Sequence, residues 1–283
     1  MSDKYCVKEF TTLLPFLQTH LHNWARNKIK QRLQTGCVSV NGLTITQHSH
    51  PLKPNDFVEI GAVSQSSAAV PAQLNILYSD RNLIAIDKPA GLLSVGNTKE
   101  TKQHALAILR KQLSRKSQEI KLWPVHRIDR DTSGVLLFAT SREIREAVMA
   151  KWDRAEKTYL AIVDGVPNPS QGRIDQPLRL DEVEYRVHVG EHPDAKPALT
   201  HYKILNTTEK RALLEVQIDT GRQHQIRAHL SWLGYPVVGD ERYGKAGERM
   251  GLHAQRLKII NPNSGKELLF ESAVPLNFTR LLV

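Results

Sequence analysis

Short apolar runs set between turn residues recur along most of the chain, and they predict a sheet. The run VLLFA at residues 135–139 follows a Ser-Gly pair, a pattern typical of a buried strand. The segment ILYSDRNLIAIDKPAG predicts two further short strands that end in a turn. In KTYLAIVDG apolar and polar positions alternate, which places Tyr159 on the same strand face as Lys157 and Ala161.

Three helices are predicted in the same part of the chain. Two lie over residues 104–113 and 142–152. The third lies in TGRQHQIRAHLSWLG, where apolar residues recur at i, i+4 and i+7 from Ile226 and form a buried stripe. We expect Thr220 to cap this helix and Gly234 to end it.

Residues 1–61 have a different pattern. TLLPFLQTHL predicts one short helix, and NKIKQRLQTG predicts a second that ends at Gly36. VSVNG predicts a strand that enters a hairpin at Asn41 and Gly42, and a Pro-Asn-Asp turn precedes a closing strand, FVEIG. Four basic residues belong to the second helix: Arg26, Lys28, Lys30 and Arg32.

The stretch GAVSQSSAAVPAQ separates these two patterns. It is small, polar and almost uncharged, a composition that buries little surface and is typical of a linker. We therefore predict a small N-terminal domain at residues 1–61, a linker at 62–73 and a larger domain at 74–283.

Charge indicates the class of partner. Among 283 residues, 39 are Lys or Arg and 29 are Asp or Glu, a net charge of +10 that favours an anionic partner such as nucleic acid. No apolar run approaches the ~18 residues of a membrane span. The first residues, MSDKYCVKEF, carry charges where a signal peptide would be apolar. With only two cysteines, we expect a protein of the reducing cytoplasm.

The polar stretch HRIDRDTSG directly precedes the apolar run and contains the first candidate for chemistry. It puts Asp129 between Arg127 and Arg130. A carboxylate in such a loop can act as a nucleophile or a general base. For an isolated Arg-x-Asp pattern, however, a surface ion pair is the simpler interpretation. The stretch alone leaves both interpretations open.

Motifs for metal, nucleotide and acyl chemistry are missing from the sequence. His224 and His229 lie about 140° apart around a helix and do not share one metal, and no His-Glu-x-x-His occurs. Ser133 lies outside a Gly-x-Ser-x-Gly elbow, and no phosphate-binding glycine motif is present. His126, Asp129 and Ser133 would form an unusually crowded triad. An aspartate, a tyrosine and an arginine remain, without a metal or redox cofactor.

Several segments together resemble the RluA-type pseudouridine synthases. They are HRIDRDTSG, K-x-Y-x-A, TGRQHQIRAHL, IDKPAG, GYPVVGDERYG and GLHAQRL. The resemblance extends over residues 74–278 and departs at Ile128, where leucine is more usual, a swap of similar size. It implies an α+β fold with a mixed, largely antiparallel central sheet and flanking helices. It also implies an isomerase that converts uridine to pseudouridine in RNA without a cofactor.

The resemblance also implies roles for single residues. Asp129 would be the nucleophile or proton-handling carboxylate at the ribose, and Arg227 would keep it ionised. Tyr159 would stack on the uracil and offer its hydroxyl as a general base. Arg127 would fill the space that a flipped uridine leaves. Two further side chains are expected to contact RNA: His126 and Arg222.

The N-terminal pattern of helix, basic helix, hairpin and closing strand resembles an S4 RNA-binding domain over residues 11–61. The resemblance implies that the four basic residues of the second helix and Asn41 contact RNA. Ribosomal RNA of the large subunit is the first expected substrate and transfer RNA the second. We expect a monomer with no metal and no membrane partner.

Two alternatives from other functional classes stay open. One is an RNA-binding protein that keeps the fold without catalysis, although Asp129, Tyr159 and Arg227 are all present. The other is a cofactor-free hydrolase that uses His126 and Ser133. From the sequence we also expect that replacing Arg227 by methionine lowers activity with little effect on stability.

Overall fold

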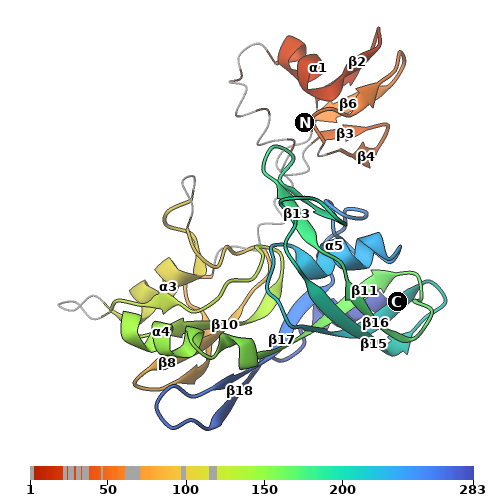
Figure 1. Cartoon of the computed structure of the whole chain (residues 1–283). Helices are drawn as coiled ribbons and strands as arrows, with labels where there is room; N and C mark the ends of the chain where they lie inside the picture. Colours follow the sequence, from red (N-terminus) through yellow and green to blue (C-terminus); the bar gives the residue numbers. More distant parts are fainter. Residues whose placement is uncertain are drawn as a thin grey trace. The chain divides into compact units, whose positions relative to one another are not determined.

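A computed structural model describes the chain outside residues 1–2, 22–23, 25–28, 30–32, 34–37, 46, 61–70, 97–99 and 115–119. The chain divides into two units, residues 1–68 and residues 69–283, and each is described by itself (Figure 1). The division falls inside the stretch predicted as a linker, most of which lies outside the described residues. No helix in the described part of the chain combines the length and apolar character needed to cross a membrane.

The first unit contains a small antiparallel sheet with strand order β1-β6-β3-β4, and a separate strand pair, β2 and β5. Its elements in chain order are β1 (Asp3–Cys6), β2 (Thr11–Thr12), α1 (Leu13–His20), β3 (Val38–Val40), β4 (Leu43–Thr44), β5 (Pro51–Leu52) and β6 (Phe57–Ile60). The first predicted helix and the closing strand are thus confirmed.

The predicted hairpin of the first unit is confirmed by its backbone. Asn41 and Gly42 have φ values of 52° and 80°, the left-handed pair that a two-residue hairpin turn requires. Of the second predicted helix, the structure describes only Ile29 and Leu33. Both are helical and 1% exposed, so they contribute to the core of this unit.

The second unit is built around one large sheet. Within the described residues, ten strands pair in it, with a main order β12-β15-β16-β11-β17-β10-β8-β7, while β18 pairs with β17 and β9 with β10. Of these pairings only β10 with β17 is parallel, which confirms the predicted α+β fold with a mixed, largely antiparallel sheet. A further hairpin consists of β13 and β14.

The strands of the second unit are β7 (Asn75–Ser79), β8 (Leu83–Lys88), β9 (Trp123–Pro124), β10 (Ser133–Ala139), β11 (Glu156–Asp164), β12 (Gln171–Asp175), β13 (Leu178–Asp181), β14 (Arg186–Val189), β15 (Leu199–Thr207), β16 (Arg211–Ile218), β17 (Leu252–Ile260) and β18 (Glu267–Glu271). Its helices are α3 (Ala105–Leu113), α4 (Arg142–Met149), α5 (Gln225–Trp232) and α6 (Leu276–Thr279), with short 3-10 turns η1 (Trp152–Arg154) and η2 (Arg280–Leu282).

Helices cover both faces of the large sheet (Figure 1). Helix α3 packs on β10 through Leu136 and Phe138, and α5 packs on β11 and β17 through Ala161 and Leu252. The register between β10 and β17 places these two helices on the same face. Helices α4 and α6 pack on the opposite face. The centre of the sheet is therefore buried on both sides, which is why β8 and β10 are buried along almost their whole length.

The parallel pair β10–β17 requires glycine at one position. Gly134 has φ +113°, and a Cβ atom there would lie 2.1 Å from the carbonyl oxygen of Ala254. At this φ a Cβ atom would point at the neighbouring backbone, so glycine allows the two strands to pair here. The start of β10, and with it the polar loop that precedes it, is thereby held against the centre of the sheet.

Two local predictions about helices are corrected. Thr220 does not cap α5, because its hydroxyl donates to the side chain of Gln225 at 2.7 Å and the residue before the helix is His224. The helix predicted over residues 142–152 ends at Met149, and a 3-10 turn follows. The end of α5 is confirmed, since Gly234 has φ +95° just after the helix.

Candidate active site

An open pocket of about 80 Å³ lies where the loop before β10 meets the start of α5. Asp129, Tyr159 and Arg227 all contribute to its walls, although they come from three separate segments. The structure therefore brings together the three residues that the sequence selected for chemistry.

The loop that carries Asp129 is fixed by hydrogen bonds from buried side chains on either side of it. The hydroxyl of Ser94 accepts from the N–H of Ile128 at 3.1 Å and donates to its carbonyl at 2.7 Å. The ammonium of Lys88, which is fully buried, donates to the carbonyl of Arg130 at 2.9 Å. Because the backbone is held before and after Asp129, its carboxylate has a defined position at the pocket.

Arg227 joins two carboxylates. Its Nε and Nη2 donate to the two oxygens of Asp240 at 2.6 and 2.8 Å, and its Nη1 donates to Oδ2 of Asp129 at 2.9 Å. Burial alone would lower the pKa of Arg227, but hydrogen bonds and charges from Asp240 and Asp129 raise it above its ordinary value. The guanidinium is therefore a permanent cation directly beside Asp129.

Asp240 is a site residue that the sequence did not single out. Its side chain is fully buried, and besides Arg227 it accepts from the backbone N–H groups of Arg242 and Tyr243. Burial raises its pKa, but the Arg227 contacts outweigh that effect and leave the pKa lowered. The only sequence signal was its position in GYPVVGDERYG, which carried no role until the structure placed it behind Arg227.

Tyr159 lies on β11 opposite Ala254 of β17, so its ring is on the pocket face of the sheet. Burial, together with the charge of Asp129, raises the pKa of Tyr159 above its ordinary value. The phenol therefore carries its proton at neutral pH. It can donate this proton, but it acts as a base only after passing the proton on.

His224 lines the pocket beside Asp129 and contacts the buried Tyr243, and sequence reasoning assigned neither a role. His224 has φ 51°, and its Nδ1 lies 3.0 Å from the hydroxyl of Tyr243. Its Nε2 lies 4.0 Å from Oδ2 of Asp129. The guanidinium of Arg227 stacks over the Tyr243 ring at 5.2 Å. A guanidinium and a neutral imidazole thus lie beside the Asp129 carboxylate, and Tyr243 contacts both of them.

Comparison with known proteins places this site in a family. Residues 82–232, which include the Asp129 loop and the whole of α5, match the family model described as RNA pseudouridylate synthase. The chain belongs to this family. It is therefore an RNA pseudouridine synthase, an isomerase that acts on RNA.

Individual relatives agree over most of the chain. It is 30% identical to YlyB of Bacillus subtilis, an uncharacterized RNA pseudouridine synthase, over 94% of this chain and 91% of the relative. It is 33% identical to the ribosomal large subunit pseudouridine synthase D of Nitrosomonas europaea, over 93% and 80%. Human RNA Pseudouridylate Synthase Domain Containing 4 has a similar structure, with a TM-score of 0.61, 29% identity, and coverage of 74% and 91%.

Of the residues predicted to contact RNA, two lie at the synthase pocket. Arg127 and Arg222 are exposed and contribute to its walls. His126 lies elsewhere: its Nε2 accepts from the backbone N–H of Leu137 at 3.2 Å, and its ring stacks near Trp152. Burial lowers the pKa of His126 to about 4, so it is neutral.

Of the RNA contacts predicted in the N-terminal unit, the structure describes only Asn41. The four basic residues Arg26, Lys28, Lys30 and Arg32 lie outside the described residues. Asn41 is exposed, but its side chain is engaged within the protein. Its amide donates to Asp56 at 2.8 Å and accepts from the N–H of Phe57 at 2.9 Å. These bonds connect the hairpin turn to the Pro-Asn-Asp turn.

The hydrolase alternative does not fit the synthase structure. Ser133 is 2% exposed, and its hydroxyl contacts Nδ1 of His253 at 2.8 Å and Nη2 of Arg249 at 2.6 Å. His253 is fully buried beneath α6. Ser133 therefore pairs with a histidine that no substrate can reach, and His126 is turned into the protein elsewhere.

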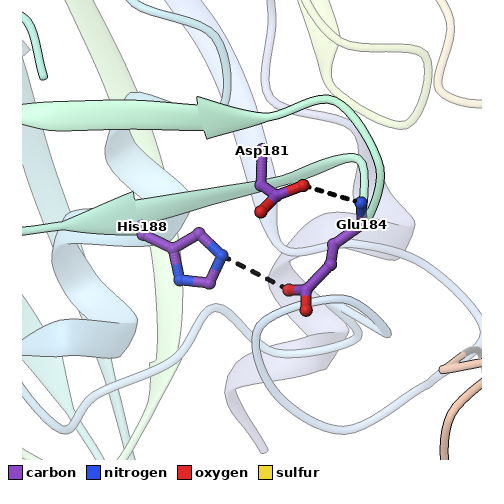
Figure 2. Close-up of side chains that lie close together, drawn as sticks. All are labelled: Asp181, Glu184 and His188. Atoms are coloured by element: carbon purple, nitrogen blue, oxygen red, sulfur yellow. Dashed lines mark hydrogen bonds and ion pairs between the residues drawn. The ribbon is translucent and has the colours of Figure 1, made fainter. Parts of the chain in front are cut away.

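A trio of possible metal ligands lies on the β13–β14 hairpin of the synthase unit. Figure 2 shows Asp181, Glu184 and His188, whose ligand atoms all lie within 4.8 Å of one another. Asp181 accepts from the backbone N–H groups of Val183 and Glu184, and Glu184 contacts His188 at 3.3 Å. These are the contacts that close an exposed hairpin turn, and exposed groups of this kind are common without a metal.

Proposed function

We propose that this synthase isomerises uridine to pseudouridine in the RNA of the large ribosomal subunit, and that Asp129 is the carboxylate that acts at the ribose. One observation carries the assignment of Asp129. It is a partly exposed carboxylate in the pocket, 26% accessible, that accepts from an almost fully buried arginine at 2.9 Å. Relatives named ribosomal large subunit pseudouridine synthase D support the choice of RNA.

The reaction requires no oxidation and no imported group. The N1–C1′ bond of uridine breaks, the base turns and C5 bonds to C1′. The proton on C5 leaves and N1 takes up a proton, so the composition is unchanged. Asp129 acts in this sequence as a nucleophile or as a proton-handling group, and both roles need the anion. The neighbouring Arg227 cation stabilises that anion in a pocket from which the substrate excludes water.

Tyr159 is the proposed partner of the base. Its ring on the pocket face offers a surface on which uracil stacks. Its raised pKa keeps the phenol protonated before substrate binds. Any action of Tyr159 as a base near C2′ therefore begins with transfer of the phenol proton to another group, and the nearest anion on the pocket wall is Asp129.

Binding requires that the target uridine leave its stack, because Asp129 and Tyr159 could not otherwise reach the reacting atoms. Extrusion of a base from the stack takes a few kcal/mol, which contacts elsewhere must supply. We propose that the exposed guanidiniums of Arg127 and Arg222 bind the flipped nucleotide and its neighbours. Arg127, next to the Asp129 loop, would fill the space that the base leaves.

We propose that residues 1–61 form an S4-like RNA-binding domain. The order of α1, hairpin β3–β4, turn and closing strand β6 supports this proposal. Arg26, Lys28, Lys30 and Arg32 are the proposed phosphate contacts. Asn41 supports the hairpin through its bonds to neighbouring turns, and its exposed position is where RNA would meet that hairpin.

The function is tested with RNA that carries tritium at C5 of uridine. Large-subunit ribosomal RNA should release label to water, while transfer RNA and small-subunit RNA should release none. The same large-subunit RNA without label should give a product of unchanged mass. Asp129→Asn should bind RNA and release only background label. Asp131→Asn removes the neighbouring carboxylate, which pairs with Arg130 at 3.3 Å, and should keep its activity. Release from Asp129→Asn would exclude Asp129. Release from transfer RNA alone would exclude the ribosomal substrate.

A further inference from the structure

His224 lies between Tyr243 and Asp129, and its place in the reaction follows from its hydrogen bonds. The residue adopts a left-handed backbone conformation directly before α5, which is uncommon for a residue other than glycine. Its side chain is 13% exposed. A conformation of this kind persists only where the surroundings determine it. Here the contact of Nδ1 with the Tyr243 hydroxyl determines which way the ring faces.

The hydrogen-bond donors and acceptors around the His224 ring determine which of its nitrogens carries the proton. The Tyr243 oxygen accepts from the backbone N–H of Val187 at 2.8 Å, and its own proton needs an acceptor. Among the described residues, Nδ1 of His224 at 3.0 Å is the acceptor in reach. If Nδ1 carried the proton instead, the Tyr243 hydroxyl would stay unsatisfied although Tyr243 is 7% exposed. The ring proton is therefore on Nε2.

The ring also holds only that one proton. Burial lowers the pKa of His224 to about 4, which outweighs the opposite effect of the Asp129 charge. A neutral imidazole that accepts at Nδ1 is a donor at Nε2. This N–H faces Oδ2 of Asp129 at 4.0 Å, the same oxygen that accepts from Arg227 at 2.9 Å. Within the described part of the chain, Oδ1 of Asp129 has no hydrogen-bond donor.

We propose that His224 is a positioning residue whose Nε2–H closes onto Oδ2 of Asp129 when a uridine fills the pocket, so that Oδ1 is the oxygen that reacts. The 4.0 Å separation is about 1 Å too long for a hydrogen bond, and such bonds often tighten only when substrate binds. When Arg227 and His224 both donate to Oδ2, the carboxylate cannot rotate, and Oδ1 stays oriented toward the ribose. This inference rests on the proposed role of Asp129.

Two substitutions in the full chain separate positioning from structural support. His224→Gln keeps an N–H donor at the position of Nε2 but loses the acceptor for Tyr243. His224→Asn keeps an acceptor at the position of Nδ1, and asparagine tolerates the left-handed conformation, but it has no donor that reaches Asp129. We expect the single-turnover rate of label release to fall about 10–100-fold in His224→Asn, the effect of one charge-assisted hydrogen bond. His224→Gln should recover most of that rate.

A purely structural role predicts the reverse order, because asparagine preserves the contact with Tyr243. The dissociation constant for RNA and the melting temperature are measured on the same proteins, and neither should change in His224→Asn. Weaker RNA binding in that variant would make His224 an RNA contact and overturn the inference. A His224→Asn rate equal to that of the unaltered chain, or a His224→Gln rate as low as that of His224→Asn, would also overturn it.

The tautomer is tested independently by nitrogen NMR of the unaltered chain, which should show the proton of His224 on Nε2. A proton on Nδ1 would refute the inference whatever the variants do. Asp129→Asn is assayed in parallel to keep two failures apart. If Asp129→Asn still releases label, the proposed role of Asp129 fails first. If it is inactive while His224→Asn is fully active, only the inference about His224 fails.

Discussion

Replacing Arg227 by methionine should damage the fold as well as the chemistry, and the structure shows how to separate the two effects. Methionine keeps the apolar stem of the side chain but removes three hydrogen bonds, two of them to Asp240. The sequence alone led us to expect little change in stability. The buried carboxylate of Asp240 reverses that expectation, because it would stay buried without a cation.

The size of the effect follows from this unpaired charge. Removing one partner of a buried ion pair costs about 3–5 kcal/mol. For a unit of this size that corresponds to a fall in melting temperature of about 6–20 °C. Adding Asp240→Asn removes the buried charge, while its amide oxygen can still accept from the N–H groups of Arg242 and Tyr243. The double variant should therefore regain at least half of the lost stability.

Activity should not return with stability. In the double variant Asp129 still lacks its cation, so label release from tritiated RNA should stay at least 100-fold below that of the unaltered chain. Thermal melts and label release on the two variants complete the comparison. Recovery of activity by Asp240→Asn would mean that Arg227 acts only through the fold, and an unchanged melting temperature in Arg227→Met would refute the role given to Asp240.

The same pair predicts a dependence on pH. In the unaltered chain Arg227 keeps the pKa of Asp240 low, so this contribution to stability is present above the unfolded pKa near 3.9 and is lost as the pH falls through the folded value. Without Arg227, burial should raise the folded pKa above the unfolded one. The folded state then binds more protons, so the stability gap between Arg227→Met and the unaltered chain should narrow from pH 7 to pH 4. A gap that widens would contradict this reasoning.

Three further changes test other parts of the structure. Gly134→Ala should prevent cooperative unfolding of the synthase unit in a thermal melt, because its Cβ would clash with Ala254, whereas Gly190→Ala, also at positive φ but with open space around it, should cost only about 1–2 kcal/mol. Tyr159→Phe should lower label release about 10²–10⁴-fold without weakening RNA binding in a titration. A chain starting at Leu74 should fold yet bind RNA more weakly, with a shallower dependence of affinity on salt than the full chain, and equal slopes would contradict the proposed N-terminal domain.

Local sequence patterns were enough to predict most of the helices and strands. The run at residues 135–139 became the centre of β10 because an apolar run between turn residues has few other places in a protein than the core. The Asn41 hairpin followed from the left-handed conformation that its two turn residues adopt readily. Asp129 and Arg227 were paired in advance only through the family resemblance, since 98 residues separate them and no periodicity connects them.

Contacts between distant segments account for the features that the sequence missed. Thr220 is a good capping residue, yet its hydroxyl bonds to Gln225, which also bonds to Leu199 and Thr200. A rule that considers one helix cannot foresee this competition. Asp240 follows α5 in the chain and returns to Arg227 only through the turn before β17. Its role depends on how completely it is buried, which no local pattern encodes.

Three aspartates near the pocket show why burial and donors, not residue type, separate the candidates for chemistry. Asp240 is fully buried, and all its contacts are to fixed donors, so it anchors Arg227 and cannot reach a substrate. Asp131 has a side chain that is 44% exposed and pairs at 3.3 Å with the adjacent Arg130, which is a surface ion pair. Asp129 alone combines a permanent buried cation on one oxygen with a second oxygen left open to the pocket. That combination places a carboxylate beside a cation and still leaves it available, which is what attack at C1′ or removal of a ribose proton would demand.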